Sequence, residues 1–238
     1  MPATPAGAVS AAGTALLPHA IFTAAMSSEI DHIIWACADL EVGSRQFETL
    51  TGVRPRFGGV HAGGATHNAL VALGSHCYLE ILAPVGPPTA ADDAWVQIMR
   101  TAKEPRVLTY CLRSGSSLQH LAEIAAGLGW QNATVASNGR KTPAGVDLRW
   151  RWLAPISPSF GLAFPFFIDW LDSVHPARSL SAEFPTDTIE LQRFAVGHPN
   201  AQGLEHVLGL FGATIPSYAA DKSGFQVHLA TPRGIVSL

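Results

Sequence analysis

Charge is scarce in this sequence. Asp, Glu, Lys and Arg supply 14% of the 238 residues, and the formal net charge is −3. At 47% hydrophobic residues, the chain is too apolar for an intrinsically disordered protein. Without a basic cluster it has no electrostatic reason to bind nucleic acid or an anionic membrane surface, so we expect neither as a partner. Small-molecule chemistry remains the best match to this composition.

Several signature motifs are also missing. No stretch of eighteen apolar residues is free of helix breakers, which excludes a transmembrane helix. The sequence has no phosphate loop, no dinucleotide fingerprint and no GxSxG nucleophile motif. Its cysteines, Cys37, Cys77 and Cys111, lack CxxC spacing and lie in apolar, strand-like runs. They predict buried, reduced thiols and therefore a cytoplasmic protein.

The first 27 residues differ from the rest, since they contain no Lys, Arg, Asp or Glu. They lack the positive start and the unbroken apolar core of a signal peptide. We expect residues 1–28 to form a disordered N-terminal extension, or translation to start at Met26.

One order of elements recurs along the remaining chain. Residues 29–40 predict a strand, Asp39 and Gly52 mark the two ends of a helix, and three strands follow up to residue 84. A second copy starts with a strand at 106–114 and a helix from 117, has a turn-rich connection at 139–145, and ends in two strand-like runs. A third, shorter copy occupies 188–238.

Two such βαβββ modules can close a curved sheet around a cavity, whereas one module cannot bury both faces of its small sheet. The prediction is therefore an α+β domain over 29–238, with a cavity-enclosing mixed sheet and helices outside. Its modules span about 29–84, 106–171 and, in shorter form, 188–238. We expect the third module to cover an exposed sheet edge, either within the chain or across a homodimer.

Specific motifs carry a family resemblance. The stretch IDHIIWACADL, followed by a helix and CYLEIL, resembles the βαβββ module of the vicinal oxygen chelate superfamily. The stretch from His61 to Asn68, followed by Tyr78-Leu79-Glu80, resembles the motif H-x-x-x-G-T-x-N…Y-L-E of its glyoxalase-like branch, with Ala65 in place of Gly. Residues 140–145, 148–150 and 165–170 are similar to that branch too, so the resemblance covers 29–238.

The resemblance implies a divalent ion (Zn, Ni, Mn, Fe or Mg) held by the first and fourth strands of each module. Carried over by position, the ligands are His32 and Glu80, with Asp169 at the matching place of the second module. The first-strand place of that module falls on Thr109 or Tyr110, where many members have His. Two alternatives stay open. His32 and Glu80 could share a structural hydrogen bond without metal, and Asp169 could cap a turn or pair with an arginine of the neighbouring strand.

Other residues are candidates for catalysis and substrate binding. Glu80 is a candidate base, and His61, in a Gly-rich loop, is a candidate acid or base, although that loop could be an ordinary exposed connection. Candidates for substrate contact are Thr66, Asn68, Tyr78, Arg140 and Trp150. In the strand around residue 150, Arg149 and Arg151 share one face; they bind an anion if that face turns inward and are solvated if it turns outward.

The leading hypothesis is a glyoxalase-like enzyme, a metal-dependent lyase or isomerase acting on a carbonyl or vicinal-oxygen substrate. Dioxygenase chemistry ranks lower because one of its two metal-binding His positions is not filled. The alternative is a metal-free protein that sequesters a small molecule, as in drug resistance, in the same cavity.

Overall fold

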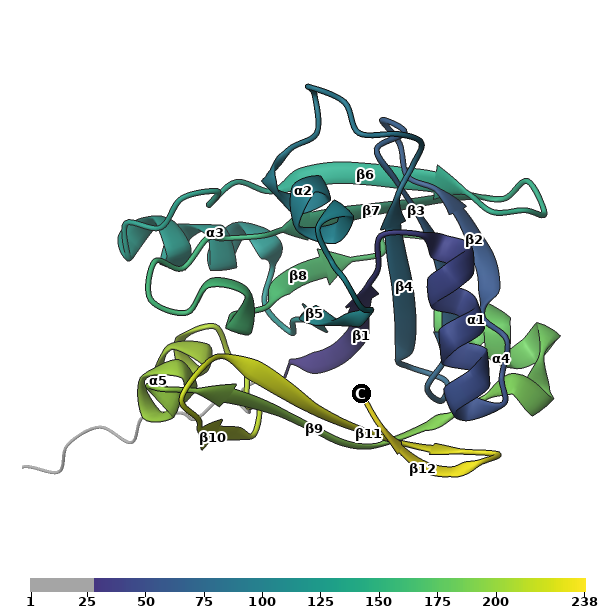
Figure 1. The fold of residues 1–238 in the computed structure, drawn as a ribbon. Coiled ribbons are helices and arrows are strands. Elements are labelled where there is room, and N and C mark those ends of the chain that lie inside the picture. The colour runs from purple at the N-terminus through teal and green to yellow at the C-terminus, as the bar shows by residue number, and fades with distance from the viewer. Residues whose placement is uncertain (1–27) are drawn as a thin grey trace, which may run out of the picture.

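The computed structural model describes residues 28–238, so the expected N-terminal extension lies outside the described residues apart from Ser28. The chain forms an eight-stranded sheet and a separate four-stranded sheet (Figure 1). Within the described part of the chain, no helix is long and apolar enough to cross a membrane.

The first module has the predicted order of elements: β1 (Glu29–Ala36), α1 (Leu40–Thr51), β2 (Arg56–Val60), β3 (Thr66–Ala72) and β4 (Tyr78–Pro84). Local sequence fixes the ends of α1. The Asp39 side chain accepts a hydrogen bond from the backbone N of Val42 at 2.8 Å. Gly52 ends the helix at φ 81°, a conformation that a residue with a Cβ rarely adopts.

Helix α2 (Ala94–Arg100) lies between the first two modules, and the second module contains β5 (Arg106–Arg113), α3 (Leu118–Gly127), β6 (Ala136–Lys141), β7 (Asp147–Leu153), η1 (Gly161–Ala163) and β8 (Phe166–Asp169). Two elements differ from expectation. The short helix α2, capped by Asp93, was not predicted. Part of the turn-rich connection at 139–145 is strand β6, where Gly139 lets the β7 backbone approach, since a Cβ there would lie 2.8 Å from the carbonyl oxygen of Leu148.

The eight strands follow the order β2-β3-β4-β1-β5-β8-β7-β6. β1 and β5 pair antiparallel in the middle, and each also pairs parallel with the last strand of its own module. The two end strands, β2 and β6, lie next to each other and nearly close the sheet. His61, just after β2, forms a backbone bridge with Arg140, and the backbone N of Ala62 donates to the carbonyl of Gly139 at 2.9 Å. The predicted curved, cavity-enclosing mixed sheet with helices outside is confirmed.

Two helices close the ends of the space inside the curved sheet. Val96 and Met99 of α2 pack on Ile34 and Leu82 at one end. At the other end, Ala177 of α4 (Pro176–Glu183) packs in a cluster with Leu70, Tyr78, Trp150 and Trp170, on the same side of the sheet. The inward-facing residues between these two clusters are the walls of the candidate site.

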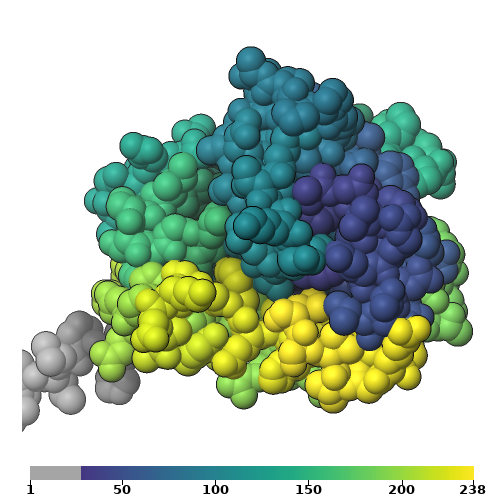
Figure 2. All heavy atoms as spheres, in the orientation of Figure 1, coloured from purple at the N-terminus to yellow at the C-terminus, as the bar shows by residue number. Residues whose placement is uncertain are grey.

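The C-terminal part contains η2 (Pro185–Asp187), β9 (Glu190–His198), α5 (Ala201–Leu210), β10 (Ser217–Ala219), β11 (Gly224–Thr231) and β12 (Gly234–Ser237). Its element order repeats that of the first module, but its strand order, β10-β9-β11-β12, does not. Its yellow atoms form a layer along one side of the molecule (Figures 1 and 2).

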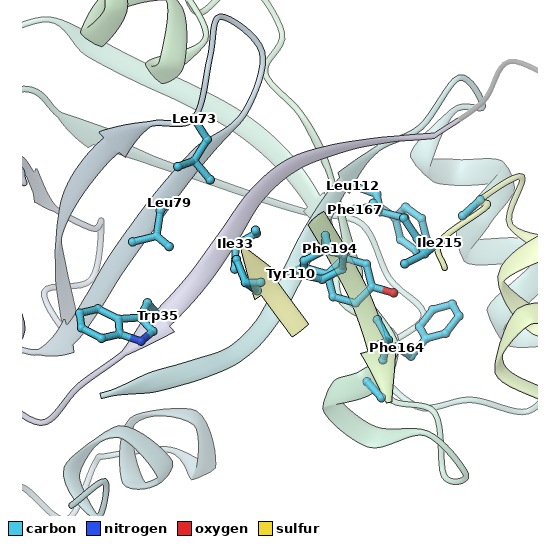
Figure 3. Close-up of a cluster of buried hydrophobic side chains, with 14 of the residues drawn as sticks. Ile33, Trp35, Leu73, Leu79, Tyr110, Leu112, Phe164, Phe167, Phe194 and Ile215 are labelled. Atoms are coloured by element: carbon cyan, nitrogen blue, oxygen red, sulfur yellow. The ribbon is translucent and has the colours of Figure 1, made fainter. Parts of the chain in front are cut away.

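Within the chain this layer covers a face of the large sheet, so the expectation that it would cover an edge there is wrong, while the alternative of an edge covered across a homodimer stays a prediction. Helix α1 contacts β3 and β4, and α3 contacts β7 and β8, which leaves the outer side of β1 and β5 to the C-terminal sheet. Apolar side chains fill that boundary, with Ile33, Tyr110 and Leu112 on one side and Phe194 and Ile215 on the other (Figure 3). Strand alternation places these residues outward, opposite to His32.

Candidate functional site

Strand alternation brings eight of the residues singled out from the sequence to the inner side of the large sheet. They are His32, His61, Thr66, Asn68, Tyr78, Glu80, Arg140 and Trp150; all are buried except His61, which is half-buried. They come from both modules and meet only because the sheet curves and its outer strands join.

Glu80 is the centre of this group. Its carboxylate is 5% exposed and accepts a hydrogen bond at Oε1 from the side-chain amide of Asn68, at 2.7 Å. Nε2 of His32 lies 3.5 Å from Oε2, and Nε2 of His61 lies 3.6 Å from Oε1. A carboxylate this deeply buried needs partners, and the Asn68 amide supplies the one hydrogen bond, while the two imidazole nitrogens lie close enough to share a proton or an ion with it.

A bulge in β1 sets the orientation of His32. The pairing with β5 shifts between Ile30 and His32, so Asp31 is the extra residue and its side chain lies on the same side as that of His32. Asp31 Oδ1 lies 2.7 Å from Nδ1 of His32. When Nδ1 carries the proton and donates it to this carboxylate, Nε2 turns a free lone pair towards Glu80.

Asp31 has further partners beyond His32. Nε1 of Trp170 donates to Oδ2 at 3.0 Å, and Nε2 of His175 lies 3.0 Å from the same oxygen. Burial by itself would raise the pKa of Asp31, but the hydrogen bonds with His175 and His32 outweigh it and hold that pKa well below its usual range. The carboxylate therefore stays charged although it is fully buried.

Neither Asp31 nor His175 was expected at the site from the sequence. Asp31 directly precedes His32, and simple alternation assigns it to the opposite face, so only the bulge reveals its role. His175 precedes a proline, and it caps α4 by accepting from the backbone N of Ala177 at 3.3 Å. A Pro following a residue able to accept a hydrogen bond is a helix-start signal that could have identified α4.

His61 is held by a neighbour in its own loop. Its Nδ1 lies 2.8 Å from the hydroxyl of Thr66, and its Nε2 lies 3.3 Å from the amide nitrogen of Asn68. Burial lowers the pKa of His61, and the positive charge of Arg140 adds to this effect while Glu80 opposes it. The imidazole is therefore kept neutral at physiological pH.

Arg140 is a buried cation that forms no salt bridge with any described acidic residue. It is 7% exposed, and its hydrogen bond goes to the carbonyl oxygen of Gly58. Burial lowers the pKa of its guanidinium, although Tyr78 and Glu80 oppose this effect. A guanidinium has five donors, so Arg140 retains capacity to bind an anion.

Aromatic rings surround the polar group. Tyr78 stacks on His32 with ring centroids 4.6 Å apart, and Trp150 meets His61 edge-on at 5.9 Å. Burial raises the pKa of Tyr78 well above its usual value, so its phenol stays protonated. These rings exclude water and strengthen the electrostatic interactions of Glu80.

Asp169 does not join this group. Its inner neighbours Ile168 and Trp170 pack with Tyr78, so alternation turns Asp169 to the outer side of the sheet. There it accepts a hydrogen bond from Arg151 at 2.5 Å, with 40% of its side chain exposed. Arg149 and Arg151 are exposed as well, which agrees with the solvated alternative for this pair.

The positions of the donor atoms show how many protein ligands the site offers to a divalent ion. The 3.5 Å between His32 Nε2 and Glu80 Oε2 suits two ligands of one ion, since each would lie about 2.0–2.2 Å from it. Module two adds no carboxylate or imidazole, because Ile168 faces inward and the hydroxyl of Thr109 donates to the carbonyl of Leu162. These donors fit an open site with two protein ligands, completed by water or substrate oxygens, and not a closed four-ligand site.

A second group of potential ligands, Asp31, His32 and Cys111, is buried with ligand atoms within 4.8 Å of one another. It suits a metal less well. Nδ1 of His32 already pairs with Asp31, and burial raises the pKa of the Cys111 thiol well above its usual value. A metal needs the thiolate, so we assign Asp31 to orienting His32 instead.

A groove of about 880 Å³ adjoins the site. Three of its lining residues, Leu70, Arg140 and Leu148, also lie on the inner side of the sheet, and Leu70 pairs directly with Glu80 between β3 and β4. Side chains of directly paired residues lie on one face with Cβ atoms about 4.5–5.5 Å apart. The groove therefore lies next to the buried carboxylate, with Leu70 and Arg140 between the two.

Comparison with known proteins adds independent findings. The family described as "Glyoxalase-like domain" matches residues 30–209. A solved structure of a hypothetical protein from Staphylococcus aureus has a TM-score of 0.59 at 19% identity, covering 86% of this chain and 82% of that chain. Methylmalonyl-CoA epimerase from Mycobacterium tuberculosis has a TM-score of 0.40 at 16% identity, covering 63% of this chain and 91% of that chain. No curated protein matches.

Proposed function

Because the chain belongs to the glyoxalase-like domain family of the vicinal oxygen chelate superfamily, we propose that it is an enzyme that moves a proton beside a carbonyl group of an anionic small molecule. One observation carries the proposal. A buried carboxylate, Glu80, with two imidazole nitrogens within 3.6 Å, adjoins a groove whose lining includes Arg140, a cation without a salt bridge to any acidic residue that the structure describes. A carboxylate in such a setting is a base, and the cation supplies a place for the anionic end of the substrate.

The roles of the residues follow from their contacts. Arg140 binds the anionic group and fixes the substrate at the inner end of the groove. Glu80 removes a proton from the carbon beside the carbonyl, while the Asn68 amide holds the carboxylate in position through Oε1. Neutral His61, fixed by Thr66, lies 3.6 Å from Oε1 of Glu80; it takes the abstracted proton from the Glu80 carboxyl, becomes an imidazolium and returns that proton to the substrate.

His32 and Glu80 would hold a divalent ion, which when bound supplies a Lewis acid for the carbonyl oxygen. His32 is ready for this role because Asp31 occupies its Nδ1 and leaves Nε2 for the site. Tyr78 and Trp150 keep water away from the carboxylate. The proton transfers assigned above use only side chains of this chain.

Proton exchange tests the proposal without knowledge of the final product. The full chain is incubated in D₂O with 2-oxo acids, acyl thioesters and hemithioacetals that each carry a carboxylate, and ¹H NMR follows loss of the signal beside the carbonyl. We expect exchange with at least one class and at least a ~100-fold loss in Glu80→Gln. Failure of every class to exchange above the buffer rate would contradict the proposal.

Elemental analysis of protein purified without a His-tag tests whether the site binds a divalent metal ion. We expect stoichiometric metal in the wild type and none in a His32→Ala, Glu80→Ala double variant. A metal-free wild type that binds panel compounds without exchanging their protons would instead support the sequestration alternative.

A further inference from the structure

The groove beside the site has an unusual lining for a protein surface. Among the large hydrophobic side chains that are exposed, four lie along it: Phe57 and Val146 at 51% and 56%, and Leu171 and Val174 at 49% and 55%. They come from β2, the β6–β7 turn and the segment between β8 and α4, which are distant in sequence. Single exposed apolar residues are ordinary, but several around one hollow mark a binding surface.

The inner end of the groove is charged. Arg140 lines it, is itself 7% exposed, and forms no salt bridge with a described carboxylate. Its guanidinium donates to the carbonyl of Gly58, another lining residue, which fixes its position. The lining also includes charged residues such as Arg56, Asp147 and Glu183, but a fixed, buried cation together with the exposed apolar side chains is complementary to a molecule with an anionic head and an apolar tail.

The size of the groove decides how large that tail is. Pockets that bury a drug-sized ligand measure about 300–1,000 Å³, and this groove measures about 880 Å³. A two- or three-carbon acid would leave most of it empty, whereas a chain of eight to ten carbons contacts the apolar lining.

We propose that the ligand class of this site is an amphipathic carboxylate, with its head on Arg140 and an aliphatic or aromatic tail along Phe57, Val146 and Val174. The inference rests on the proposed function, because it names the substrate class of the same site. It adds that specificity comes from the groove rather than from the polar residues around Glu80.

A chain-length series tests the inference. Straight-chain carboxylates from acetate to decanoate, kept below their micelle concentrations, are titrated into the full protein by calorimetry. Each buried methylene is worth about a fourfold gain in affinity, so affinity should rise steadily with length. Alcohols of equal length should bind at least about tenfold more weakly, because they cannot replace a charge-assisted hydrogen bond to Arg140.

Variants at the groove identify the place of binding. In Val146→Asn/Val174→Asn the gain per methylene should shrink, while acetate binding is unchanged. A control double variant, Val42→Asn/Ile235→Asn, alters two exposed apolar residues outside the groove (44% and 66% exposed) and should behave as the wild type. Affinity that does not depend on chain length, alcohols binding as well as acids, or equal behaviour of both double variants would overturn the inference.

The two proposals fail separately. Chain-length-dependent binding without proton exchange keeps the amphipathic ligand and removes the proposed chemistry. Proton exchange on short substrates, without any dependence on chain length, keeps the chemistry and removes the amphipathic ligand.

Discussion

Asp31 and His32 are neighbours in the sequence, yet both lie on the inner side of the sheet, with Oδ1 of Asp31 2.7 Å from Nδ1 of His32. The bulge in β1 makes this possible, because it inserts one unpaired residue opposite β5. The contact fixes which imidazole nitrogen faces Glu80 and links it, through Asp31, to His175 at the start of α4.

Replacing Asp31 by Asn should therefore impair the site before it impairs the fold. Asn keeps the shape but loses the charge that orients His32, so we expect proton exchange or metal affinity to fall about 10- to 100-fold. The free energy of unfolding should fall by about 3 kcal/mol, since the buried groups that bind Asp31 no longer face a carboxylate charge. Exchange rates and urea denaturation measure the two effects, and an unchanged exchange rate would show that Asp31 does not act through His32.

Asp169→Asn should leave activity unchanged, because this residue lies on the outer side of the sheet with Arg151. Arg151 holds the pKa of Asp169 below its ordinary value, but an exposed ion pair contributes at most about 1 kcal/mol. Proton exchange and thermal denaturation check both statements. A loss of activity comparable to that of Glu80→Gln would mean that Asp169 reaches the site.

The stability of the protein should fall as the solution is acidified through the range of histidine titration. Burial depresses the pKa of His61 in the folded state, so below about pH 6.5 the unfolded chain takes up this proton first. The stability that neutral His61 contributes to the fold is fully present above the pKa of the unfolded state, and it is lost as the pH falls through the pKa of the folded state. Urea denaturation at several pH values gives the free energy of unfolding as a function of pH. This free energy should fall less steeply on acidification in His61→Gln than in the wild type. In His120→Gln, whose side chain is 61% exposed, it should fall as in the wild type.

Tyr110→Phe should stabilise the protein. The hydroxyl of Tyr110 is buried without a hydrogen-bond partner among residues 28–238, and the tyrosine ring packs on aromatic rings that include Phe194, with ring centroids 4.8 Å apart. Removing a polar group that has lost its water and gained no partner should raise the free energy of unfolding by about 1 kcal/mol. Thermal and urea denaturation measure it, and a clear decrease in stability would indicate that the hydroxyl has a partner.

A chain that ends at residue 187 should not fold cooperatively. The C-terminal sheet covers Ile33, Tyr110 and Leu112, which are fully buried in the intact protein. Without it, a wide apolar face on the central strands would meet water. Circular dichroism, dye binding and size-exclusion chromatography should show a molten or aggregated product, whereas a cooperatively unfolding monomer would contradict this prediction.

The repeated modules were predictable because their signals are local. The cap at Asp39, the helix end at Gly52 and the short apolar run of β4 depend on neighbouring residues alone. The C-terminal repeat shows the limit of this reasoning. Its element order matches the first module, but strand pairing depends on contacts between distant segments, and there the two differ.

The sequence by itself determined the fold class and the family resemblance, and through that resemblance the pairing of His32 with Glu80, since motifs are properties of short segments. Only the tertiary structure decided what surrounds them. The bulge that turns Asp31 inward, the approach of His175 and the closing contact of Arg140 with Gly58 join residues of different elements. The outward turn of Asp169 depends on which face the closed sheet encloses, and no local pattern records that.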